Sequence, residues 1–122
     1  MSLSAKTCVP CRGGQEPLDK ATAEEMVQQV PGWELDEEAR RIVRRFKLSD
    51  FMEAVEFVNG VAEIAEQQEH HPDIRLGYGY AEIWIHTHKI GGLHENDFIL
   101  AAKINAFDFP PLRCSKPAHD GQ

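Results

Sequence analysis

The sequence has no long apolar run, few cysteines and fewer basic than acidic residues. No apolar run approaches the roughly 20 residues that a helix needs to cross a membrane, and the N-terminus has no apolar core of a secretory signal peptide. The three cysteines are an odd number, which suits a reducing compartment better than a disulfide framework. We therefore expect a cytoplasmic protein that makes no contact with a membrane.

Basic side chains are outnumbered: 13 Lys and Arg stand against 20 Asp and Glu, which gives a net charge of −7. Direct binding of nucleic acid needs clustered cations to neutralise phosphates. The one basic cluster, Arg40, Arg41, Arg44 and Arg45, is short and mixed with apolar residues. We interpret it as the solvated face of a strand and expect no direct nucleic-acid partner.

A length of 122 residues fits one compact domain. Proline and glycine near the N-terminus interrupt any periodicity. We expect an extended N-terminal arm over 1–16, the domain over 17–112 and a C-terminal tail over 113–122.

Cys8 and Cys11 have the spacing of half a zinc site or of a redox pair. A closed zinc site needs four ligands, and only the distant Cys114 and His119 remain as candidates. We therefore interpret the pair as part of a loop.

Two shorter helices are predicted, one near each end of the domain. Thr22 and Glu25 form a capping box that opens the first, and Pro31 ends it. The other covers about residues 95–107 and is apolar on more than one side. Such a helix must be covered on more than one side, which favours packing between subunits of a homo-oligomer.

A longer amphipathic helix of about five turns lies between them. Asp50 and Glu53 form its capping box, and Pro72 ends it because proline disfavours helix at the preceding residue. Its apolar stripe is expected at Phe51, Val55, Val58, Ala62 and Ala65, widened by Phe57, Val61 and Ile64.

Alternating patterns predict two hairpins, one over 33–35 and 40–48 and the other over 74–78 and 80–88. The last strand has two faces: Ala81, Ile83, Ile85 and Thr87 toward the core, and Glu82, Trp84, His86 and His88 toward the open face. The order α-β-β-α-β-β-α predicts an α+β fold, with three helices packed on one face of a four-stranded antiparallel sheet.

Five of the six histidines lie between residues 70 and 94. His86 and His88, joined by His70 or His71, could ligate a metal. Alternatively, His70 and His71 could work as acid and base, since a helix C-terminus favours a cation and a neighbouring histidine disfavours a second one. Each histidine could also be structural. Spacing alone leaves the metal and acid/base interpretations open.

Several motifs together resemble the pterin-4a-carbinolamine dehydratase family. They are Glu69-His70-His71-Pro72, Thr87-His88, Gly92-Leu93 with Asp97, and the Pro-Gly-Trp after the first helix. The resemblance covers about residues 17–107. It implies the same α+β fold and assembly as a homodimer or homotetramer.

The resemblance also implies an activity without metal or cofactor. Members remove water from 4a-hydroxytetrahydrobiopterin to give quinonoid dihydropterin, which recycles the cofactor of aromatic amino acid hydroxylases. It assigns catalysis to His70, His71 and His88, and binding of the substrate to Glu66, Glu69, Pro72, Thr87 and Asp97.

Three positions depart from the family pattern. Ile74 replaces a frequent aromatic residue, His94 replaces a capping Ser or Thr, and His86 has no family role. Some relatives are binding proteins that act as an assembly factor for a carbon-fixing enzyme or as a transcriptional dimerisation cofactor. Those tend to have lost catalytic histidines, so the three retained here favour an enzyme, and a protein partner would be a second role.

Overall fold

The computed structural model describes residues 3–8 and 16–107. The predictions for Cys11, Cys114, His119 and the C-terminal tail fall outside these residues. The elements are η1 (Leu3–Ala5), α1 (Lys20–Val27), β1 (Glu34–Leu35), β2 (Ile42–Lys47), α2 (Phe51–Gln68), β3 (Asp73–Gly77), β4 (Tyr80–Ile85), η2 (His88–Ile90) and α3 (Glu95–Ala106), where η denotes a 3₁₀-helix. The predicted α+β order is confirmed.

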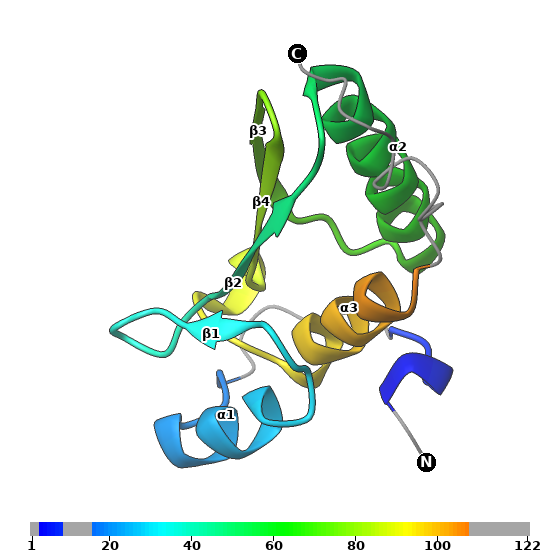
Figure 1. Cartoon of the computed structure of the whole chain (residues 1–122). Coiled ribbons are helices and arrows are strands. Elements are labelled where there is room, and N and C mark those ends of the chain that lie inside the picture. Colours follow the sequence, from blue (N-terminus) through cyan, green and yellow to red (C-terminus); the bar gives the residue numbers. More distant parts are fainter. Residues whose placement is uncertain (1–2, 9–15, 108–122) are drawn as a thin grey trace.

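The four strands form one antiparallel sheet in the order β1-β2-β4-β3. The helices α2 and α3 lie on one side of it, and α1 lies beside its β1 end (Figure 1). Apolar residues from all three helices and from one sheet face form a single core. Ala81, Ile83 and Ile85 of β4 are fully buried in it, as their alternation predicted.

The helix α1 begins three residues before its predicted start. Asp19 is the N-cap, and its carboxylate accepts a hydrogen bond from the backbone N–H of Thr22 at 2.8 Å. The predicted cap, Thr22, is therefore inside the helix. Asp19 and Thr22 are both good capping residues, and the earlier one prevails here.

The helix α2 begins as predicted, with the Asp50 carboxylate accepting from the backbone N–H of Glu53 at 2.8 Å. Its buried face differs from the predicted stripe, because Phe51 is 49% exposed and Ala62 is exposed. The apolar residues of α2 fit two adjacent stripes of helical period, and the sheet selects one of them. The buried apolar residues are Ala54, Phe57, Val61 and Ala65.

The helix α2 ends at Gln68, and Glu69 caps it. The chain therefore leaves the helix before Pro72, to which we had attributed the end. Glu69 adopts the left-handed conformation (φ 54°, ψ 38°), and the backbone N–H of His70 donates to the Ala65 carbonyl at 3.1 Å. Such a C-terminal cap turns the chain sharply out of the helix. His70 and His71 therefore lie in the segment between α2 and β3.

The helix α3 is covered by its own chain on the side for which we expected a partner subunit. The element η1 packs against α3, with Leu3 buried, and the Lys103 ammonium donates to the Ser4 carbonyl at 2.9 Å. The apolar breadth of α3 is thus explained within one molecule. The prediction of a homo-oligomer rests on the family resemblance alone.

The strand β4 ends at Ile85, three residues earlier than predicted. Thr87 then forms an isolated bridge with Gly92, closed by a hydrogen bond from the Thr87 N–H to the Gly92 carbonyl at 2.8 Å. Between them, Gly91 takes a positive φ of 65°, which glycine adopts without strain. A tight loop, and not the sheet, therefore positions His88.

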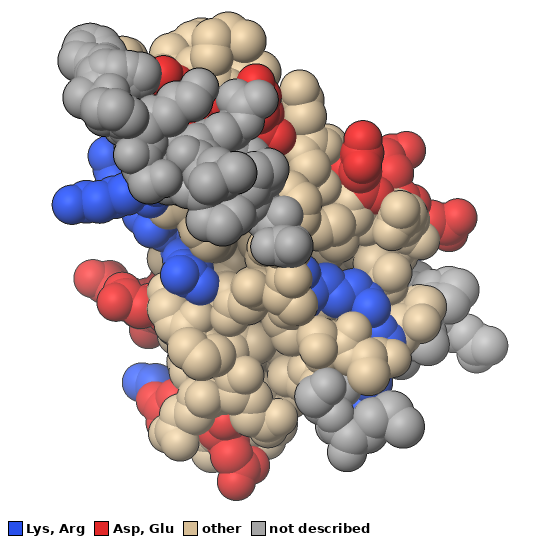
Figure 2. Space-filling view, turned by 45° about the vertical axis from the view of Figure 1, so that its right-hand side comes forward, with Lys and Arg blue, Asp and Glu red and all other residues tan. Residues whose placement is uncertain are grey.

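The predicted basic cluster is divided between the two faces of β2. Arg41 and Arg45 lie over the rings of Trp84 and Tyr80 on the open face, at 4.7 and 4.0 Å. Arg44 points the other way and donates to the Asn105 side chain at 2.6 Å. On the side seen in Figure 2, basic side chains stand in small groups, separated by uncharged surface. None of the described helices is both long and apolar enough to cross a membrane.

Candidate active site

Asp97, in the first turn of α3, is fully buried and accepts three hydrogen bonds. His70 Nε2 lies 2.6 Å from Oδ1, while the Thr87 hydroxyl and the His94 backbone N–H donate to Oδ2, each at 2.8 Å. The three partners come from the end of α2, the loop after β4 and the start of α3. One carboxylate therefore joins the three segments that carry the histidines.

The bond to Asp97 determines the tautomer of His70. An ionised carboxylate only accepts hydrogen bonds, so the imidazole donates through Nε2, and in a neutral ring Nδ1 carries no proton. The His70 side chain is only 11% exposed, which limits its rotation. The ring is a hydrogen-bonding group of fixed orientation.

His94 performs the capping role that a Ser or Thr was expected to have. Its Nδ1 accepts from the backbone N–H of Asn96 at 3.0 Å, and Asp97 closes the capping box from the other side. A ring nitrogen thus replaces a hydroxyl oxygen without loss of the cap. This departure from the family pattern leaves the start of α3 intact.

His71 lies at the surface, next to the half-buried His70. Its Nε2 is 2.6 Å from Glu66 Oε2, and the two side chains are 59% and 77% exposed. An ion pair this exposed adds little to stability. The pair instead holds an accessible imidazole beside a carboxylate one turn back on α2.

His88 is exposed, and its ring centroid lies 4.1 Å from that of His86. The Nδ1 atom of His86 is buried and has no hydrogen-bond partner among the described residues. Burial, and to a smaller extent the proximity of His88, lowers the pKa of His86 below its usual value. His86 and His88 therefore face the same side, as their alternate positions predicted.

Asp73 lies close to His86 and His88, and we did not predict it as a site residue. One of its oxygens lies within 4.8 Å of a nitrogen of His86 and of a nitrogen of His88. The hairpin register pairs Asp73 with Trp84, which brings it close to the end of β4. A two-residue turn at 78–79 fixes that register, so the turn is the sequence signal that could have revealed Asp73.

The predicted site residues thus lie in two chain segments, 66–72 and 86–97. Asp97 connects His70 to Thr87, whose next neighbour is His88. The remaining two are placed by the backbone: Glu69 is the exposed C-cap of α2, and Pro72 is half-buried just before β3.

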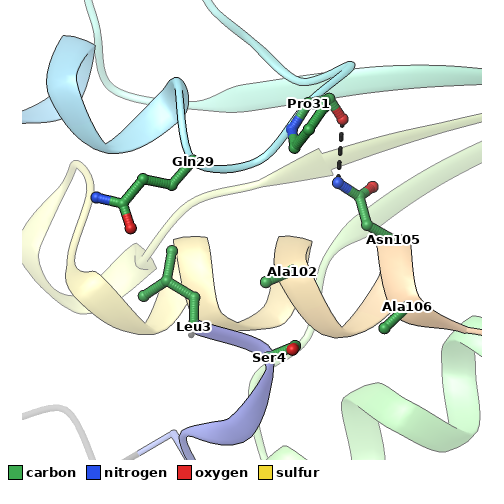
Figure 3. Close-up of a pocket in the computed structure, with 7 residues that line it drawn as sticks. All are labelled: Leu3, Ser4, Gln29, Pro31, Ala102, Asn105 and Ala106. Atoms are coloured by element: carbon green, nitrogen blue, oxygen red, sulfur yellow. Dashed lines mark hydrogen bonds between the residues drawn. The ribbon is translucent and has the colours of Figure 1, made fainter. Parts of the chain in front are cut away.

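A separate pocket of about 260 Å³ lies between η1, α3 and the segment that follows α1 (Figure 3). It is lined by Leu3, Ser4, Gln29, Pro31, Ala102, Asn105 and Ala106. The Asn105 side chain donates to the Pro31 carbonyl at 3.0 Å across it. Asn105 is eight residues along α3 from Asp97, or about 12 Å at the helical rise. None of the side chains that line the pocket titrates near neutral pH.

Comparison with known proteins identifies the family of the chain. The family model described as "Pterin 4 alpha carbinolamine dehydratase" matches residues 16–107, which is most of the chain. The chain belongs to this pterin dehydratase family. Its α+β fold is the one that the family resemblance implied.

Several proteins of this family are similar to the chain along almost their whole length. One from Halorhodospira halophila, provisionally named a pterin-4-alpha-carbinolamine dehydratase, is 64% identical over 106 residues, covering 87% of this chain and 97% of that one. A protein of the same provisional name from Methylococcus capsulatus is 50% identical over 104 residues, covering 85% and 91%.

Two solved structures have the same fold. The transcriptional coactivator/pterin dehydratase from Brucella melitensis superimposes with a TM-score of 0.70 at 30% identity, covering 75% of this chain and 98% of that one. A pterin dehydratase-like protein identified as a RuBisCO assembly factor gives 0.53 at 21% identity, covering 62% and 88%. The second likeness concerns the fold alone.

Proposed function

We propose that this protein dehydrates a 4a-hydroxytetrahydropterin to the quinonoid dihydropterin in the cytoplasm, recycling the cofactor of aromatic amino acid hydroxylases. The observation that carries the proposal is the Asp97 network. It fixes His70, a histidine of the family motif, beside the loop that holds His88. Family membership adds the substrate class.

The reaction needs one proton donor and one proton acceptor. The C4a–O bond breaks as the hydroxyl oxygen takes up a proton and leaves as water, and N5 loses its proton as the C4a–N5 double bond forms. Nothing is oxidised or reduced. Positioned side chains acting as general acid and base typically accelerate such a step about 10²- to 10⁴-fold.

We assign these two proton transfers to His71 and His88, in either order. Both imidazoles are accessible: His71 is 59% exposed and His88 is exposed. Glu66, 2.6 Å from His71, would orient that ring. A partly exposed acid and base can exchange protons with water between turnovers.

His70 would bind and orient the pterin ring, because its own bond to Asp97 keeps it rigid. Thr87 and Asp97 act through this ring as positioning residues, since both are buried. Glu69 and Pro72 shape the turn that presents the two adjacent histidines. This division separates the rigid residues from those that transfer protons.

The test is the dehydration of chemically prepared carbinolamine, followed by absorbance. The wild type should accelerate it, and His71→Ala or His88→Ala should lower the rate by about 10²-fold or more, with an unchanged circular dichroism spectrum. His94→Ser, which keeps the cap of α3, is the matched control and should retain the rate. A wild type no faster than buffer would disprove the enzyme proposal.

That outcome would favour the second candidate, a binding role. The Brucella melitensis relative is called a transcriptional coactivator as well as a pterin dehydratase, and the other structural neighbour is called an assembly factor. A chain that binds a pterin or a protein partner without accelerating dehydration would belong to this class.

A further inference from the structure

Two imidazoles and a carboxylate meet beside the proposed site. One nitrogen of His86, one nitrogen of His88 and one oxygen of Asp73 all lie within 4.8 Å of one another. Two histidines and one carboxylate are a recurrent ligand set for divalent transition metals. We propose that these three side chains bind a divalent first-row ion such as Zn²⁺, with water completing its coordination.

Small side-chain rotations would complete the geometry. Zinc with bonds of about 2.0–2.1 Å holds tetrahedral ligand atoms about 3.3 Å apart, so the three atoms have to close by up to about 1.5 Å. Asp73 and His88 are exposed and His86 is half-buried. The two exposed side chains can therefore move toward the more rigid one, and the two rings already lie 4.1 Å apart.

His86 supplies an independent reason to expect a ligand here. Its Nδ1 is buried without a hydrogen-bond partner among the described residues. Buried polar atoms are rarely left in this state, and a bound ion is one of the accepted explanations. Coordination through Nδ1 would give this atom the polar partner that the described protein atoms do not supply.

One of the three proposed ligands borders open space and a basic side chain. Asp73 also borders a surface cavity of about 390 Å³, whose other lining residues are Arg41, Ile74, Arg75 and Trp84. Arg41, stacked on Trp84, is a cation close enough to His86 to disfavour its protonation. Its charge opposes a bound metal as well, so Arg41→Gln should tighten binding.

The metal site and the proposed active site share His88. A coordinated ring nitrogen has no lone pair left for a proton, so Zn²⁺ should inhibit dehydration. This consequence rests on the proposed function, whereas binding of the ion does not. Asp73 and His86 belong to the metal site alone.

Calorimetric titration of the chelator-treated, full-length chain with ZnCl₂ tests the site. The wild type should bind one ion that Asp73→Asn or His86→Gln weakens by at least about 100-fold, the upper limit for loss of a mere supporting contact. Glu82→Gln, a matched change on the same sheet face, should bind as the wild type does. Wild-type affinity in Asp73→Asn and His86→Gln, or no binding by the wild type, would overturn the proposal.

Absorption of the Co²⁺-loaded chain identifies the donors. Nitrogen and oxygen ligands give weak visible bands, whereas a thiolate adds a strong charge-transfer band in the near ultraviolet. The expected spectrum lacks that band, and its presence would assign the ion to cysteines instead.

In the dehydration assay, Zn²⁺ should inhibit the wild type but not Asp73→Asn. Zinc binding without any dehydration would refute the proposed function only, and dehydration without zinc binding would refute the metal site only.

Discussion

At the scale of single residues, the Asp97 carboxylate connects the chemistry of the site to its structure. Its three donors are His70, Thr87 and the backbone of His94. Asp97→Asn would put an amide that can donate opposite His70 Nε2 and so favour the other tautomer. We expect dehydration to slow by about 10²- to 10⁴-fold, as when an orienting acid is lost elsewhere.

The variant Thr87→Val serves as the control for Asp97→Asn. It removes one hydrogen bond to Asp97 and keeps the charge, so it should cost about 1 kcal/mol of stability and much less activity. The rate profile against pH should shift for Asp97→Asn but not for Thr87→Val. Equal losses of activity in the two variants would contradict the tautomer argument.

His86 predicts a pH dependence of stability. Burial and His88 lower its pKa in the folded protein from the usual 6.5, so the unfolded chain binds the proton more readily. Stability from this group is present above pH 6.5 and is lost as the pH falls through the lowered pKa. Urea unfolding from pH 7.5 to 5 should show the wild type losing more stability than His86→Gln. Parallel curves of stability against pH for the two proteins would contradict this prediction.

Glu69 predicts a substitution that stabilises. A non-glycine residue in the left-handed region costs roughly 1–2 kcal/mol, so Glu69→Gly should raise the free energy of unfolding by up to about 1 kcal/mol. Thermal unfolding measures this, and the dehydration assay separates the two roles. Unchanged activity would assign Glu69 a backbone role, and lost activity a contact with the substrate.

At the scale of elements, η1 acts as part of the core although it precedes the first helix. Leu3 is 7% exposed against α3. Leu3→Ala should therefore destabilise the protein by about 2 kcal/mol, near the lower end of the range for buried leucines. Lys6→Ala, which removes a half-exposed ion pair to Glu95, should cost under about 1 kcal/mol. Urea midpoints would compare them, and equal shifts would contradict the packing role.

The regular elements could be predicted because local signals specify them. The Asp50 cap and the alternation of β4 both gave correct results. The buried face of α2 was predicted only in part, with Phe57 and Val61 correct and Phe51 wrong, because the sheet selects between two apolar stripes. The ordered η1 escaped prediction for the same reason: three residues have no period, and only α3 gives Leu3 a place to pack.

At the scale of the whole molecule, the sequence suggests candidate residues for the site but not the contacts between them. The HHP segment and His88 stand out in the sequence. The Asp97 bond to His70 spans 27 residues and depends on how α3 meets the end of α2. Asp73 depends on the hairpin register. Such relations arise from tertiary packing, which a list of motifs does not contain.

The family resemblance predicts a homodimer or homotetramer. Light scattering should give a multiple of the 13.8 kDa chain mass. Phe51 and Met52 of α2 are 49% and 62% exposed, and large exposed apolar side chains often mark contacts between chains. Phe51→Glu with Met52→Glu should lower the mass, while Lys47→Glu, an exposed charge change on β2, should not. A wild-type mass of 13.8 kDa would refute the assembly.

The capping box of α3 has a consequence for heat inactivation. Because the acid that caps this helix also holds His70, fraying of the first turn of α3 would release the ring while the rest of the fold stays intact. Catalytic output should then decline at temperatures below the main melting transition. Amide hydrogen exchange at the start of α3 should increase over the same temperatures at which activity declines. Exchange in this one helix turn would therefore report the fraction of molecules that remain active.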